Sequence, residues 1–81
     1  MTFLTRKGCH LCDEARPVLA RSIRRLGVAV NEVDIDTDDR LTAEYGLRIP
    51  VVLDPEGRVL AEGVIDDTRA LRRVLRGAFG L

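Results

Sequence analysis

The sequence contains no tryptophan, and aromatic residues make up only 4% of its 81 positions. A surface that stacks on nucleic-acid bases needs exposed aromatic side chains, so we do not expect one here. Thirteen basic residues balance thirteen acidic ones, which leaves a formal net charge of zero. Such a chain has no overall electrostatic attraction to nucleic acid or to an anionic membrane. We therefore expect neither of them as a partner.

Long apolar runs are also missing. No stretch approaches the roughly 18 apolar residues that a membrane-spanning helix requires. The opening MTFLTRKG places its basic residues after a short apolar run, which is not the layout of a secretory signal peptide. We therefore predict a cytoplasmic protein. Structural disulfides are rare in that compartment, so neighbouring cysteines there are more often catalytic or metal-binding.

The length allows little more than one compact unit. Eighty-one residues fit a single domain, which we place at residues 1–81. A chain of this size buries only about 60% of the surface that its unfolded form exposes, so its core is thin. We expect a monomer with one active face.

Cysteine and histidine occur only in the segment TRKGCHLCDEARP, as Cys9, His10 and Cys12. The cysteines could form a reactive redox pair, part of a metal site, or an inert disulfide or two unpaired thiols. Zinc usually needs four ligands, so we expect no metal site within one chain. A metal or iron–sulfur centre would need a second chain to supply the missing ligands.

The hydrophobic pattern predicts alternating strands and helices. Leu11, Ala15, Val18, Leu19, Ile23 and Leu26 follow a helical period, so we expect a helix over residues 11–26 that ends at Gly27. Strands are expected around Phe3–Leu4 and at residues 28–36, 50–53 and 58–62. A short helix capped by Asp36 or Thr37 should carry Leu41 and Tyr45, and a last helix capped by Asp66 or Asp67 should carry Leu71, Val74, Leu75 and Ala78 on one face. The order β-α-β-α-β-β-α predicts an α/β fold with a four-stranded mixed sheet flanked by three helices.

Arg24 and Arg25 fall in the last turn of the predicted first helix. Together with Arg21 they lie off its apolar stripe, and we assign these three residues no role.

A Cys-x-x-Cys motif beside a βαβ pattern is typical of thioredoxin-like redox proteins. The segments GCHLC, EVDID, RIPVV and GVIDD resemble the glutaredoxin branch of that superfamily, particularly its small glutaredoxin-like proteins, over nearly the whole chain. The resemblance implies a thioredoxin-like fold. Two departures are visible: Phe3 stands where thioredoxins carry a buried acid, and Val64 replaces the second glycine of a Gly-Gly pair, which weakens the prediction of glutathione binding.

The resemblance implies a small dithiol–disulfide oxidoreductase with no bound organic cofactor. Cys9 would be the nucleophile and Cys12 the resolving thiol, because Cys9 precedes a helix whose free N–H groups favour the thiolate. Arg6 and His10 would lower the Cys9 pKa further. The alternatives are a metal or iron–sulfur carrier that uses the same cysteines in a dimer, and a catalytically silent interaction domain.

The resemblance also implies a substrate site. A cis Ile49–Pro50 bond would leave the Ile49 backbone free to pair with a substrate peptide. Glutathione is a possible co-substrate: Lys7 and Arg48 would meet one of its carboxylates, and Asp66 and Asp67 at the start of the last helix would receive its γ-glutamyl end. Because of Val64 we expect a protein disulfide ahead of a glutathione mixed disulfide as the substrate. The sequence does not identify the electron donor.

Overall fold

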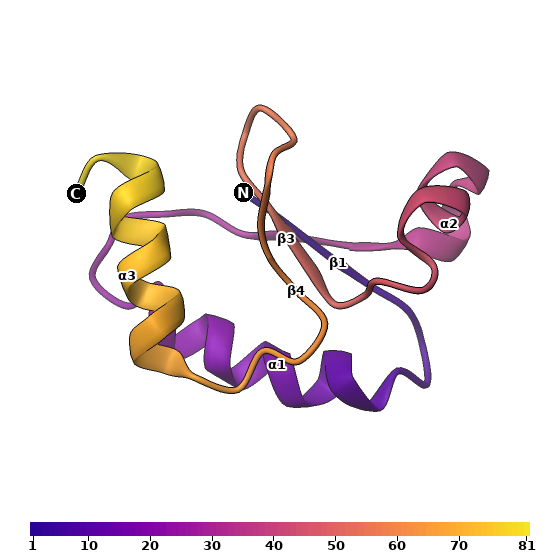
Figure 1. Ribbon diagram of the computed structural model, residues 1–81, viewed down its shortest axis with the longest axis horizontal. Helices are drawn as coiled ribbons and strands as arrows, with labels where there is room; N and C mark the ends of the chain where they lie inside the picture. The colour runs from indigo at the N-terminus through magenta and orange to yellow at the C-terminus, as the bar shows by residue number, and fades with distance from the viewer.

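The computed structural model describes residues 1–81 and has a four-stranded mixed sheet flanked by three α-helices (Figure 1). The elements are β1 (Thr2–Thr5), α1 (His10–Ser22), β2 (Asn31–Asp34), the 3-10 helix η1 (Ile35–Thr37), α2 (Asp39–Tyr45), β3 (Val51–Leu53), β4 (Val59–Glu62) and α3 (Thr68–Phe79). This order is the predicted one. None of the helices has the length and apolar content needed to cross a membrane.

The strands lie in the order β2-β1-β3-β4. Because α1 crosses over between them, β1 and β2 run parallel, whereas β3 is antiparallel to both β1 and β4. The turn of the β3–β4 hairpin is closed by Asp54, whose carbonyl accepts a hydrogen bond from the Gly57 N–H at 3.0 Å. The mixed sheet and its terminal hairpin, both predicted, are thereby confirmed.

The sheet separates two apolar clusters, because successive side chains of a strand point to opposite faces. On one face, Phe3 and Val52 pack with residues of α1 and α3. On the other face, Leu4 and Val51 pack with Ile35 and with partly buried residues of α2. The first cluster fixes α1, the helix that begins beside the cysteines, against the middle of the sheet.

Helix α1 ends at Ser22, four residues before the predicted end, so the predicted position of its carboxyl-terminal end was wrong. Ser22 is fully buried, and its Oγ lies 2.7 Å from the Val18 carbonyl oxygen and 3.1 Å from that of Thr68. The chain turns directly after this contact, and Arg25 adopts a left-handed conformation with φ of 63°. Arg24 and Arg25 therefore lie beyond the helix.

The ends of the other helices need smaller corrections. The N-cap of α2 is Asp38, and neither Asp36 nor Thr37 caps it, because η1 occupies those positions and Asp38 Oδ1 accepts from the next free N–H groups. Of the four apolar residues predicted on one face of α3, Leu71 and Leu75 are buried, whereas Val74 and Ala78 are exposed. The helix faces the core through a narrower stripe than its apolar pattern predicted.

Replacing Asp67 with alanine should destabilise the protein by about 1 kcal/mol, because Asp67 is the N-cap of α3 and its Oδ1 accepts a hydrogen bond from the Ala70 N–H at 3.0 Å. The neighbouring Asp66 accepts no such bond and is exposed, so Asp66→Ala is the matched control, with an expected effect within about 0.5 kcal/mol. Urea unfolding measures both values. Equal losses in the two variants would contradict the assignment of the cap.

Candidate functional site

The two cysteines lie at the amino-terminal end of α1 and form a disulfide bond with their Cα atoms 5.2 Å apart. Cys9 is the N-cap residue of the helix, and its Sγ accepts a hydrogen bond from the Cys12 N–H at 3.1 Å. Cys9 is partly exposed, whereas Cys12 is fully buried. An external group therefore reaches the sulfur of Cys9 before that of Cys12.

A tight turn leads from β1 into the cysteines. The Cys9 N–H donates to the Arg6 carbonyl at 3.3 Å, and Gly8 within this turn has a φ of 74°. This left-handed conformation favours glycine, although a side chain at position 8 would meet no atom within 4 Å. The requirement for glycine is thus conformational, and it sets the direction in which Cys9 enters the helix.

The structure gives Arg6 a partner that sequence reasoning did not predict. Its Nε lies 3.1 Å and 3.0 Å from the two carboxylate oxygens of Asp36, and its Nη2 lies 2.8 Å from Oδ1. These hydrogen bonds raise the pKa of Arg6 and lower the pKa of Asp36. Arg6 therefore anchors the cysteine turn to η1, and its positive charge is already balanced. Whether Arg6 tunes Cys9 stays a prediction.

Lys7 and His10, the other two candidate residues beside the cysteines, differ in whether they have a charged partner. Lys7 is exposed and forms no ion pair, so its charge remains available. His10 is also exposed, and its Nε2 lies 3.0 Å from Glu14 Oε1, one helical turn along α1. The imidazole thus points toward a carboxylate on its own helix, and its effect on Cys9 stays a prediction.

A polar network that sequence reasoning missed holds α1 to β2 beside the cysteine turn. Arg16 donates through Nε and Nη2 to the two carboxylate oxygens of Glu32, both at 2.9 Å, and through Nη1 to Asp13 at 3.0 Å. The hydrogen bonds from Arg16 lower the pKa of Glu32, which also accepts from Thr5 Oγ1 at 3.0 Å. The spacing of Asp13 and Arg16 on one helix could have been recognised in the sequence. The contact with Glu32 depends on the packing of the helix on the sheet.

Arg48 also forms hydrogen bonds with acidic side chains of the chain. It donates to Glu62 at 3.0 Å and 3.1 Å and to Glu44 at 2.9 Å, and its guanidinium lies 5.0 Å from the centre of the Tyr45 ring. These contacts raise the pKa of Arg48, with the hydrogen bond to Glu62 as the main cause. A substrate carboxylate would have to share the guanidinium with these two acids, because three of its five N–H donors are already used. The sequence did not predict these partners, and whether Arg48 also meets a substrate carboxylate stays a prediction.

Ile49 and Pro50 connect Arg48 to β3. The peptide bond between them is cis, Pro50 is buried and Ile49 is partly buried. The Pro50 carbonyl accepts a hydrogen bond from the Gly63 N–H at 2.9 Å, and the Arg48 carbonyl accepts from the same group at 3.2 Å. This segment is therefore fixed against the loop that follows β4.

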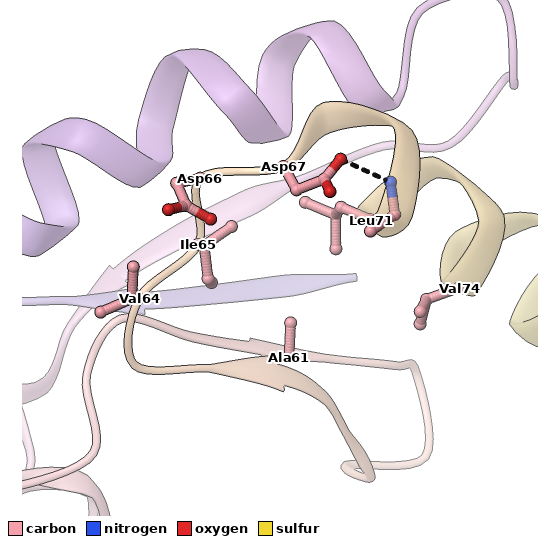
Figure 2. A pocket seen from close by; sticks show the side chains of 8 residues that line it. Ala61, Val64, Ile65, Asp66, Asp67, Leu71 and Val74 are labelled. Atoms are coloured by element: carbon pink, nitrogen blue, oxygen red, sulfur yellow. Dashed lines mark hydrogen bonds between the residues drawn. The ribbon is translucent and has the colours of Figure 1, made fainter.

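Asp66 and Asp67 lie at a separate hollow of about 170 Å³ between β4 and the start of α3 (Figure 2). Ala61 and the exposed side chains of Val64 and Val74 line the same hollow. Arg6 shares a second hollow of about 480 Å³ with Lys7, and a third of about 530 Å³ with Arg48. Neither cysteine lines any of these hollows.

No group of three or more histidine, cysteine, aspartate or glutamate side chains is placed to hold a metal ion. A structural zinc site normally has four ligands. A metal carried by Cys9 and Cys12 would therefore need further ligands from outside the chain.

Comparison with known proteins gives consistent matches. The family model described as "Glutaredoxin-like domain (DUF836)" matches residues 1–73. The uncharacterized proteins Rv0508 of Mycobacterium tuberculosis and Mb0520 of Mycobacterium bovis are each 34% identical to the chain over 82 residues, which cover 95% of this chain and 84% of theirs.

Two solved structures of the Northeast Structural Genomics target protein XcR50 from X. campestris are also similar. The X-ray structure has a TM-score of 0.78 at 39% identity and covers 94% of this chain and 95% of its own. The solution structure has a TM-score of 0.71 at 42% identity and covers 94% and 91%.

Proposed function

Because the chain belongs to the glutaredoxin-like domain (DUF836) family and has a thioredoxin-like fold, we propose that it is a dithiol–disulfide oxidoreductase. The observation that carries the proposal is the asymmetry of the cysteine pair. Cys9 is partly exposed at the mouth of α1, and Cys12 is fully buried one helical turn later, within bonding distance of Cys9. Fold alone does not fix function, so the proposal rests on this pair.

The proposed reaction is a thiol–disulfide exchange in two steps. The Cys9 thiolate attacks one sulfur of a substrate disulfide; the substrate S–S bond breaks, the other sulfur leaves as a thiolate, and a mixed disulfide forms. The Cys12 thiolate then attacks Cys9 Sγ and releases the second substrate sulfur as a thiolate. The substrate has gained two electrons, and the protein holds the Cys9–Cys12 disulfide. A reduced thiol donor must return two electrons before the next cycle.

The helix supports the role of Cys9 as the attacking group. The thiolate is the nucleophilic form of cysteine, and the first N–H groups of a helix have no partner within the helix. The Cys12 N–H already donates to Cys9 Sγ at 3.1 Å, and the positive end of the helix dipole lies at the same place. A negative charge on Cys9 is stabilised by both effects.

A protein disulfide is the substrate that we propose ahead of a glutathione mixed disulfide. Arg48 is held by Glu44 and Glu62, and Val64 lies in the loop before α3 with 64% of its surface exposed. These features disfavour the binding of a small peptide with two carboxylates. Lys7 remains a free cation beside the cysteines, and the Ile49–Pro50 segment is the proposed contact for the substrate backbone.

Alkylation tests the assignment of the nucleophile. In the reduced protein at pH 7, iodoacetamide should modify Cys9 at least about tenfold faster than Cys12, because Cys9 is more exposed and its thiolate is stabilised by the helix. Peptide mass spectrometry at timed intervals measures both rates, and a urea-unfolded sample gives the reference rates of two ordinary thiols. Equal and slow labelling of both residues between pH 6 and pH 9 would favour a catalytically silent interaction domain.

A further inference from the structure

Four arginine residues line one hollow at the end of α1 that lies away from the cysteines. The hollow has a volume of about 340 Å³ and is lined by Arg21, Arg24, Arg25 and Arg72 alone. The first three belong to the end of α1 and the turn after it, and the fourth belongs to α3. Figure 1 shows the start of α3 close to this end of α1. The hollow therefore depends on the tertiary packing of the two helices.

The positive charge of this hollow has no counterion within the chain. Elsewhere Arg6, Arg16, Arg48 and Arg58 each form an ion pair with a carboxylate, but none of the four lining arginines does. The sequence contains no aspartate or glutamate from residue 15 to residue 31, nor from residue 68 to residue 81. The net charge of zero thus conceals a strongly basic region on one end of the molecule.

Helix chemistry accounts for only part of this charge. The carboxyl-terminal end of a helix carries roughly half a negative charge, which a nearby arginine complements. Arg72 Nη1 also donates to the Arg24 carbonyl at 2.9 Å. Each guanidinium carries five N–H donors, so most of the donors around the hollow still have no acceptor in the chain. One cation is enough to balance the partial negative charge at the helix end, so the other three arginines are not explained by it.

Arg25 is the only residue other than glycine with a positive φ, at 63°. A side chain in this left-handed conformation is strained, and glycine would remove the strain. Conformations of this kind are found preferentially at functional sites. Here the strained position supplies one of the four guanidinium groups of the hollow.

We propose that this hollow binds a multiply charged phosphate group carried by a small molecule. Arginine presents paired donors that match phosphate oxygens bidentately. A phosphate group offers up to two charges and three terminal oxygens, so several arginines can share it, whereas a single carboxylate balances only one. A shallow hollow lined by only four residues fits a small ligand better than a nucleic-acid backbone, which needs an extended basic track. The site does not depend on the proposed thiol exchange.

Calorimetric titration of the full chain with inorganic pyrophosphate in 0.15 M NaCl tests the proposal. The wild type should bind one equivalent saturably, and citrate should bind less tightly. The double variant Arg21→Gln, Arg24→Gln should weaken pyrophosphate binding at least tenfold. The matched control Arg40→Gln, Arg73→Gln removes the same charge at two exposed arginines outside the hollow and should change affinity less than twofold.

Arg25→Gly gives an independent readout, because it should weaken pyrophosphate binding two- to fivefold while raising the midpoint of thermal unfolding. A variant in which Cys9 and Cys12 are both serine should bind pyrophosphate as the wild type does. Phosphate binding can therefore be tested independently of the proposed thiol exchange. The proposal is overturned by equal weakening in both double variants, by absence of saturable binding, or by equally tight binding of citrate. Tighter binding to duplex DNA or to anionic lipid vesicles than to pyrophosphate would also overturn it.

Discussion

Cys9→Ser is expected to abolish the reduction of protein disulfides, with the rate falling to that of the uncatalysed reaction, about a thousandfold or more below the wild type. A serine hydroxyl is not ionised near neutral pH and cannot replace the thiolate that the end of α1 stabilises. Reduction of insulin disulfides by dithiothreitol, followed by turbidity, measures this loss. Circular dichroism should show unchanged secondary structure, because Cys9 is partly exposed and can be replaced by a residue of similar volume.

The matched variant Cys12→Ser should lose protein-disulfide reduction but retain the first step of the exchange. Its Cys9 still attacks, and without Cys12 the mixed disulfide is not resolved, so a covalent complex with the substrate protein should accumulate. Non-reducing gel electrophoresis of cell extract detects the complex, and added dithiothreitol should cleave it by reducing the mixed disulfide. The double serine variant, which should trap nothing, is the control.

The same variant separates the two candidate substrates. Reduction of a glutathione mixed disulfide needs only Cys9, because free glutathione can resolve the intermediate. We expect Cys12→Ser to show little of this activity, given the occupied Arg48 and the exposed Val64. Full glutathione-dependent turnover by Cys12→Ser, without any trapped protein, would reverse our order of the two substrates.

The features that the sequence predicted correctly are those that local patterns determine. The strand order along the chain follows from apolar runs separated by turn residues, and the position of Cys9 before a helix follows from the period that begins at Leu11. The hairpin turn at Asp54 follows from its own four residues. Each of these signals lies within a few residues of the feature that it specifies.

The features that were missed depend on contacts between distant segments. Helix α1 ends at Ser22 because α3 packs there, and nothing within residues 11–26 indicates that stop. Arg6 reaches Asp36, 30 residues away, only because the parallel pairing of β1 and β2 brings their ends together. The sequence does not show that Arg72 lies beside the arginines at the end of α1, so their shared hollow could not be predicted.

Phe3→Ala should remove a large part of the stability of the fold. Phe3 is 1% exposed in the middle of β1 and belongs to the core cluster that joins the sheet to α1 and α3. Deleting a buried phenylalanine side chain costs about 3–5 kcal/mol, through lost burial and the cavity that remains. A domain of this length is stable by about 4–12 kcal/mol in total, so the loss is at least about a quarter of the stability and could equal all of it.

Urea unfolding followed by circular dichroism measures the effect, and the chain provides a matched control in its other phenylalanine. Phe79 lies in the last turn of α3 and is only partly buried against the same cluster, so Phe79→Ala should cost clearly less than Phe3→Ala. Phe3 holds the position of the buried acid of thioredoxins, and in this protein that position is part of the apolar core. If Phe3→Ala were as stable as Phe79→Ala, the cluster would not be what fixes α1, and with it the cysteine pair, against the sheet.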